Sequence, residues 1–101
     1  MRDRLTLQTE LEMLLGNGNV YFQPPAEVKM RYPAIRYKMS DIDNTYANNR
    51  VYASQKQYEL ILIDKDPDSE YVDKLNQFYN ASFVRAYIAD NLNHWVFTIN
   101  Y

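Results

Sequence analysis

Residues 58–63, Tyr-Glu-Leu-Ile-Leu-Ile, lead directly into Asp64-Lys-Asp-Pro-Asp-Ser69, and these two runs decide the fold. The first run is short and almost continuously apolar, which predicts a strand buried on both faces at the centre of a sheet. The second run ends this strand and begins a helix. Because proline fits the first helical position and pushes the residue before it towards extended geometry, Asp66 is predicted to cap a helix that begins at Pro67.

Two amphipathic helices are predicted to lie against this sheet. Tyr71, Leu75 and Phe78 recur at helical spacing after the acidic turn, so the first helix presents one apolar face. The second is predicted over Asp3–Leu15, where the leucines share a face. Residues 16–19, Gly-Asn-Gly-Asn, end it, because glycine and asparagine tolerate the left-handed backbone of a helix stop.

Four further segments are typical of strands. Val20–Phe22 is short and stops at two prolines, and Ala34–Met39 alternates apolar with charged residues. Ser82–Ile88 and His94–Tyr101 also alternate, and the turn between them predicts a hairpin. The sequence therefore predicts a single α+β domain over residues 1–101, with a mainly antiparallel sheet of about five strands and two helices packed on it.

Two segments are predicted to contact other chains. The chain ends within a strand, so Trp95–Tyr101 is expected to leave a sheet edge uncovered, and such an edge can pair with another chain. Ser40–Ala53 is polar and long for a connection, and Arg50–Tyr52 can extend the next strand, which would make the segment the tip of a projecting hairpin. Ten tyrosines exceed the need of a small core and suit interfaces as well as strands. The predicted interface residues are Asp41, Asp43, Tyr46, Asn48, Arg50, Tyr52, Arg85, Trp95, Phe97 and Tyr101.

Composition excludes several classes of function. The chain has 101 residues, a formal net charge of −2 and no cysteine, so it lacks a basic footprint for specific nucleic-acid binding and has no thiolate chemistry. No apolar run is long enough to span a membrane. His94 is the only histidine, so one chain cannot assemble a Ser-His pair or a histidine-rich metal site.

The acids at positions 64, 66 and 68 invite comparison with a calcium-binding loop. An EF-hand loop counted from Asp64 requires glycine at its sixth position and glutamate at its twelfth, where this chain has Ser69 and Leu75. Helix capping accounts for these acids, so no metal, cofactor or catalytic residue is predicted, and the chain is not expected to be an enzyme.

Four strings, in this order, resemble a family of small virion proteins from the head–tail region of long-tailed bacteriophages, and the closest group is the tail terminators, or tail completion proteins. The resemblance covers residues 21–101, and the strings are Tyr21-Phe-Gln-Pro-Pro25, Tyr32-Pro-Ala-Ile35, Ile63-Asp-Lys-Asp-Pro-Asp-Ser69 and Ala89-Asp-Asn-Leu-Asn-His94.

The resemblance implies a structural protein of the virion, assembled in the host cytoplasm. Terminators form a hexameric ring on the last ring of tail-tube subunits, end tube polymerisation and present a surface to the head connector. The expected partners are therefore other copies of the chain, the tail-tube protein and the head–tail connector proteins. Two alternatives stay open: a connector or stopper protein of the phage neck, and a small α+β ligand-binding or regulatory module, which would require an apolar pocket with convergent polar groups.

Overall fold

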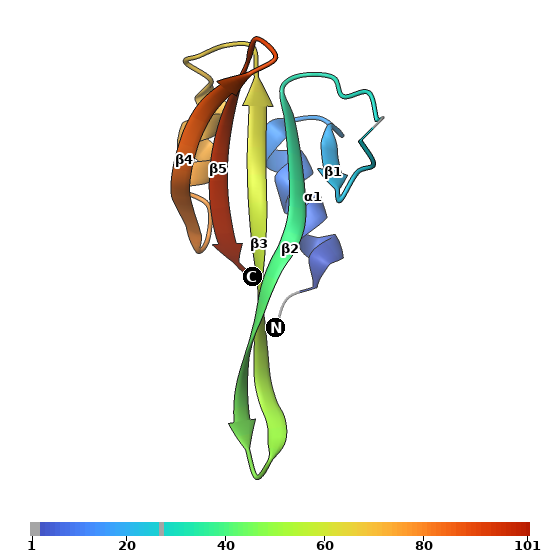
Figure 1. Cartoon of the computed structure of the whole chain (residues 1–101), viewed down its shortest axis with the longest axis vertical. Helices are drawn as coiled ribbons and strands as arrows, with labels where there is room; N and C mark the ends of the chain where they lie inside the picture. Colours follow the sequence, from blue (N-terminus) through green and yellow to red (C-terminus); the bar gives the residue numbers. More distant parts are fainter. Residues whose placement is uncertain (1–2, 27) are drawn as a thin grey trace.

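The computed structural model describes residues 3–26 and 28–101. Its five strands form one sheet in the order β1-β2-β3-β5-β4, antiparallel throughout except that β1 runs parallel to β2 (Figure 1). The predicted α+β class, with two helices on a mainly antiparallel sheet, is confirmed. In chain order the elements are α1 (Arg4–Leu15), β1 (Val20–Phe22), β2 (Ala34–Ala47), β3 (Arg50–Asp64), α2 (Glu70–Asn76), β4 (Ala81–Ala89) and β5 (Leu92–Asn100).

Both helices cover the same face of the sheet, and the core lies between these two layers. Leu60 of β3 is fully buried there, together with the inward leucines of α1 and Leu75 of α2. On the opposite face of β3, Glu59 and Ile61 are only half-buried. The predicted central position of this strand is therefore right, but its predicted burial on both faces is wrong over these residues, because no helix covers the second face.

The two helix starts differ in how well the sequence predicts them. In α1 the backbone N–H of Thr6 donates to Asp3 Oδ1 at 2.8 Å, and Gly16 adopts a left-handed φ of 78° after the last turn, as expected of its end. The start predicted at Asp66 is wrong, because α2 begins at Glu70 with Ser69 in the cap position.

The acidic turn instead satisfies its own backbone. Asp64 Oδ1 accepts from the backbone N–H of Asp66 at 3.3 Å, and Asp66 Oδ1 accepts from that of Asp68 at 2.9 Å. Each carboxylate thus bonds two residues ahead, an arrangement that competes with helix capping for the same side chain.

Both long hairpins turn on two residues with positive φ. Asn48 and Asn49 have φ of 53° and 61°, and Asp90 and Asn91 have the same pair of values. Positive φ at both central positions defines a type I′ turn, whose twist matches that of the flanking strands and which Asn and Asp accept well. These turns fix the register of β2 with β3 and of β4 with β5.

The β2–β3 hairpin continues far beyond the rest of the sheet, and we call its projecting part, residues 40–57, the arm (Figure 1). The molecule is 51 Å along its longest axis because of this extension. Every buried side chain in the described structure lies outside the arm. The loop predicted over Ser40–Ala53 is thus mostly strand, and the interpretation of that segment as the tip of a projecting hairpin is right.

The prediction of an uncovered edge at Trp95–Tyr101 is wrong. Strand β5 pairs with β3 on one side and with β4 on the other, over residues 93–100 with β3 and 92–99 with β4. The hairpin turns so that its second strand lies next to β3, which leaves the first strand, β4, as the edge of the sheet.

Candidate functional site

The tip of the arm has apolar side chains that the described residues leave exposed. Tyr46 is 65% exposed and its cross-strand partner Val51 56%, while Ile42, nearer the base of the arm, is 45% exposed. Asn48 and Arg50 beside them are exposed as well. A cluster of this kind on a projecting hairpin is typical of a surface that meets another macromolecule.

A groove runs between α2 and β4 on the helical face of the sheet, and it is apolar in its larger part and polar in its smaller part. It consists of two adjoining hollows, of about 330 and 260 Å³, which share Val72, Asp73 and Trp95, and we call it the Trp95 groove. On the floor of the groove, the half-exposed ring of Phe83 packs edge-on against the buried ring of Phe97, with ring centroids 5.5 Å apart. The remaining lining residues are Pro67, Asp68, Ser69, Asn76 and Ala86.

One buried polar atom of the Trp95 groove has no partner within the described chain. Ser69 is 6% exposed, and its Oγ makes no hydrogen bond. A buried hydroxyl without a partner carries a free-energy cost that a ligand or a second chain could relieve.

The rim of the Trp95 groove is acidic. Residues 66–73 include four carboxylates and no cation, and Asp68 and Asp73 line the groove itself. Both of these side chains are exposed, so the apolar floor is bordered by negative charge in contact with solvent. Such a border favours an occupant with positive charge.

Three of the ten tyrosines, Tyr37, Tyr58 and Tyr101, are buried in the core and are not part of an exposed surface. The hydroxyl of Tyr37 donates to Gln8 Oε1 at 2.5 Å and accepts from Arg4 Nη1 at 3.4 Å. Burial raises the pKa of Tyr37 and of Tyr58 above the ordinary tyrosine value. Part of the tyrosine content therefore joins α1 to the sheet.

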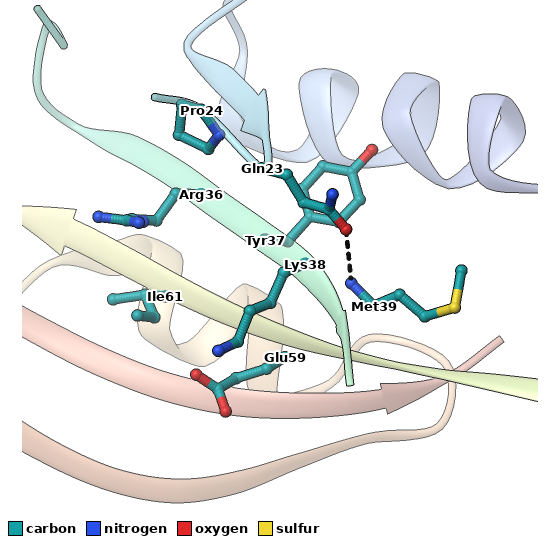
Figure 2. Close-up of a pocket in the computed structure, with 8 residues that line it drawn as sticks. All are labelled: Gln23, Pro24, Arg36, Tyr37, Lys38, Met39, Glu59 and Ile61. Atoms are coloured by element: carbon teal, nitrogen blue, oxygen red, sulfur yellow. Dashed lines mark hydrogen bonds between the residues drawn. The ribbon is translucent and has the colours of Figure 1, made fainter. Parts of the chain in front are cut away.

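A further pocket, of about 270 Å³, lies at the foot of the arm (Figure 2). The side chains of Arg36, Lys38 and Glu59 line it from the face without helices, whereas the ring of Tyr37 points away towards α1. The side chain of Gln23 closes one end by accepting from the backbone N–H of Met39 at 3.4 Å. The lining combines charged groups of both signs with the apolar side chains of Pro24, Met39 and Ile61, so it differs from a predominantly apolar ligand pocket with a few convergent polar groups.

The acidic and histidine side chains of the described residues do not converge on a metal site. Within residues 3–26 and 28–101 there is no group of three or more His, Asp or Glu side chains that could hold a metal ion. His94 stacks on Tyr87 with ring centroids 4.7 Å apart, and its Nδ1 lies 3.0 Å from the carbonyl oxygen of Leu92. This arrangement gives His94 a packing role on its strand.

The structure separates the ten predicted interface residues into three groups. Phe97 and Tyr101 are 0% and 4% exposed, so their prediction as contact residues is wrong, because β5 is an inner strand and both pack in the core. The side chains of Asp43 and Tyr52 lie outside the described part. The others are accessible on the arm, on β4 or in the Trp95 groove, namely Asp41, Tyr46, Asn48, Arg50, Arg85 and the half-buried Trp95.

Sequence reasoning missed the exposed apolar residues of β4. Phe83 is 50% exposed, Val84 47% and Ile88 75%. The signal is present in the sequence, since this strand has apolar residues at both alternate sets of positions and only one charge, Arg85. A strand that is apolar on both sides yet lies at an edge has surface to cover.

Comparison with protein-family models finds no family that matches the chain, and comparison with curated proteins finds no similar sequence. Neither described helix has the length and apolar character that crossing a membrane requires.

Proposed function

We propose that this chain is a structural subunit of a long-tailed bacteriophage virion that assembles into a closed, hexameric ring at the end of the tail. The ring ends polymerisation of the tail tube and joins the tube to the head connector. The proposal rests on the four terminator-like strings between residues 21 and 94 and on the surfaces described above. It assigns the chain no catalytic reaction and no cofactor.

The observation that carries the proposal is that one protomer has two unlike exposed surfaces, the arm tip and the Trp95 groove. A ring requires a heterologous contact, in which one patch of each copy meets a different patch of the next. A chain whose apolar surface lay in a single patch would favour a twofold dimer. Here the apolar tip with Arg50 and the apolar groove with Asp68 and Asp73 differ in shape and in charge.

The arm itself supports an assembly role. A two-stranded hairpin without a third strand or a helix behind it is marginally stable in water. Beyond its base, where Gln57 pairs with Asn100 of β5, the arm has neither, and it exposes Ile42, Tyr46 and Val51 along its length. An element of this kind gains its stabilisation from another chain.

Mass photometry and negative-stain electron microscopy of the concentrated protein test the ring directly. The expected result is a closed particle with the mass of six copies. Co-expression with the proteins encoded beside its own gene tests the location, and we expect the ring to be recovered on tail tubes whose length it limits. A strictly monomeric protein that binds neither tubes nor connectors would contradict the proposal, whereas binding to a connector alone would favour the neck-protein alternative.

A further inference from the structure

We propose that the arm tip of one copy docks into the Trp95 groove of a second copy, with Tyr46 as the side chain that enters the groove. This inference rests on the proposed function in one respect, since it names the contact by which ring subunits would join. It is argued from the tip, the groove and the position of each in the protomer.

The tip has the composition of an anchoring surface. Tyr46 is the most exposed aromatic side chain of the described arm, and Arg50 lies across the same two-residue turn. Tyrosine and arginine are enriched among the few residues that dominate binding energy at interfaces. A tyrosine ring also keeps its hydroxyl able to hydrogen-bond at the rim of an apolar site.

The Trp95 groove has the size and lining to receive such a side chain. Its larger hollow of about 330 Å³ is lined by the rings of Phe83, Trp95 and Phe97 and by the methyl groups of Val72 and Ala86. Ser69 lines the smaller hollow, and its buried Oγ makes no hydrogen bond within the described residues. A phenol entering the groove would cover the aromatic floor and bring a hydroxyl of its own among polar groups.

The charges of the two surfaces are complementary. Within residues 46–51 the only charged residue is Arg50, whereas residues 66–73 provide four acids and no cation. Arg50 pairs with Ala47 and so lies on the opposite face of the tip from Tyr46 and Val51. A tip that inserts end-on therefore brings its cation against the negative border that Asp68 and Asp73 form on the side of α2.

A protomer cannot fill its own groove. The arm points away from the body, while α2 and β4 lie within the body on the other side of β5 (Figure 1). The tip of the arm and the groove are therefore available only to separate molecules, and their contact links copies head to tail.

Pairing through sheet edges is a poorer alternative, because the exposed edges are interrupted. Asp41 Oδ1 accepts the backbone N–H of Ile42 at 2.8 Å, and Gln23 Oε1 accepts that of Met39, so two donors on β2 are already used. Strand β4 has an extra residue at Val84, where the register with β5 shifts. Such bulges and self-satisfied donors are devices that prevent strand addition.

Site-directed cross-linking gives a direct test, because the chain has no cysteine of its own. Asn48→Cys places a thiol at the tip and Asn76→Cys places one at the wall of the groove. When the two variants are mixed and oxidised, we expect mainly the mixed dimer, with few dimers of either variant alone. Met13→Cys, on an exposed position of α1, is the control for random collisions. Mixed dimers no more frequent than with this control, or mainly Asn48→Cys dimers, would overturn the inference.

Substitutions test the two side chains. Tyr46→Ser and Arg50→Glu are each expected to weaken self-association at least tenfold in sedimentation equilibrium, and Arg50→Glu combined with Asp73→Arg is expected to recover most of the loss. Arg31→Glu is the matched charge control. Circular dichroism and thermal melting establish that each variant remains folded.

The outcomes separate this inference from the proposed function. If the native protein forms rings but Tyr46→Ser and Arg50→Glu associate as it does, the docking is wrong and the ring stands. If cross-links join tip to groove but particles grow without closing, the docking stands and the terminator ring is wrong.

Discussion

Shortening the arm separates its role in folding from its role in assembly. Deleting residues 42–47 and 50–56 leaves Asn48 and Asn49 as a two-residue loop between Asp41 and Gln57, which are already cross-strand partners. We expect the shortened protein to keep the folded body and to lose self-association, because the arm contributes no buried side chain in the described structure.

The expected change in stability is limited because two contributions oppose one another. Reducing the connection from the whole arm to a two-residue turn lowers the entropic cost of loop closure by about 2 kcal/mol at most, taking roughly 0.6 kcal/mol for each halving of its length. The six lost cross-strand pairs, from Ile42–Lys56 to Ala47–Arg50, cost about 0.2–1 kcal/mol each, or roughly 1–6 kcal/mol together. The free energy of unfolding is therefore expected to fall by no more than about 4 kcal/mol, against a total of roughly 5–15 kcal/mol for a domain.

Urea denaturation measures this directly, because Trp95 is the only tryptophan and lies half-buried in the body, where its fluorescence reports unfolding. Sedimentation equilibrium on the same samples measures assembly. Asn49→Gly keeps the full arm and favours the same turn, so it serves as the control. An unfolded body, or a loss of more than about 5 kcal/mol, would refute the view that the arm lies outside the core. Undiminished self-association would refute its role in assembly.

Three further results are expected of the body. Phe97→Ala should lower the free energy of unfolding by about 3–5 kcal/mol in urea titration, because it empties a fully buried position. The contribution of Tyr37 and Tyr58 to stability should be constant up to about pH 10 and fall above it. Burial raises the pKa of Tyr37 and Tyr58 in the folded state, so the unfolded chain loses these protons first, and urea titrations at increasing pH measure the effect. Asn91→Val should lower the melting temperature, because a β-branched residue at φ 61° costs about 1–2 kcal/mol.

Each of these expectations has a result that contradicts it. A Phe97→Ala protein of native stability that fails to assemble would place this ring at an interface. A pH profile unchanged by Tyr37→Phe would remove that hydroxyl as a source of the alkaline effect. Native stability in Asn91→Val would mean that the type I′ turn does not fix the hairpin, and Asn91→Gly is the matched variant that should retain it.

Local pattern in the sequence was sufficient for most elements of the fold. Alternation in His94–Tyr101 and leucine spacing in Asp3–Leu15 predicted a strand and a helix correctly. In each case the apolar residues repeat with the period of the element, so they fall on the one face that packs in the core. Gly16 ended the helix as expected because a left-handed residue there costs glycine little.

The failures concern choices that local pattern does not determine. Local pattern allows either strand of the last hairpin to lie beside β3. The strand order is set by core packing, because Phe97 and Ile99 of β5 are buried only when β5 takes the inner position. In the same way, Asp66 could cap a helix or bond two residues ahead. Tertiary packing places Ser69 and Leu75 inward and so moves the helix start.

Of the two candidate surfaces, one could be predicted from local sequence and the other depends on the tertiary fold. The tip residues Tyr46, Asn48 and Arg50 could be predicted. A polar segment that contains two turn-forming residues and joins two strands is expected to extend into solvent as a hairpin. The Trp95 groove could not be predicted, since it exists only where α2 stops short of β4 and leaves Phe83 uncovered. Only the topology brings these parts of the chain together.

Under the proposed assembly, the direction of the arm decides whether head-to-tail contacts close. A heterologous contact gives a ring only if the rotation from one copy to the next divides a full turn, and otherwise it gives an open filament. The docking residues fix where the tip binds, but the angle between arm and body depends on the backbone. Strand β2 has an extra residue at Ser40, where the arm leaves the body, and a second register shift lies between Thr45 and Tyr46. Because bulges bend and twist a strand pair, these two positions and not the contact surfaces determine the size of the ring.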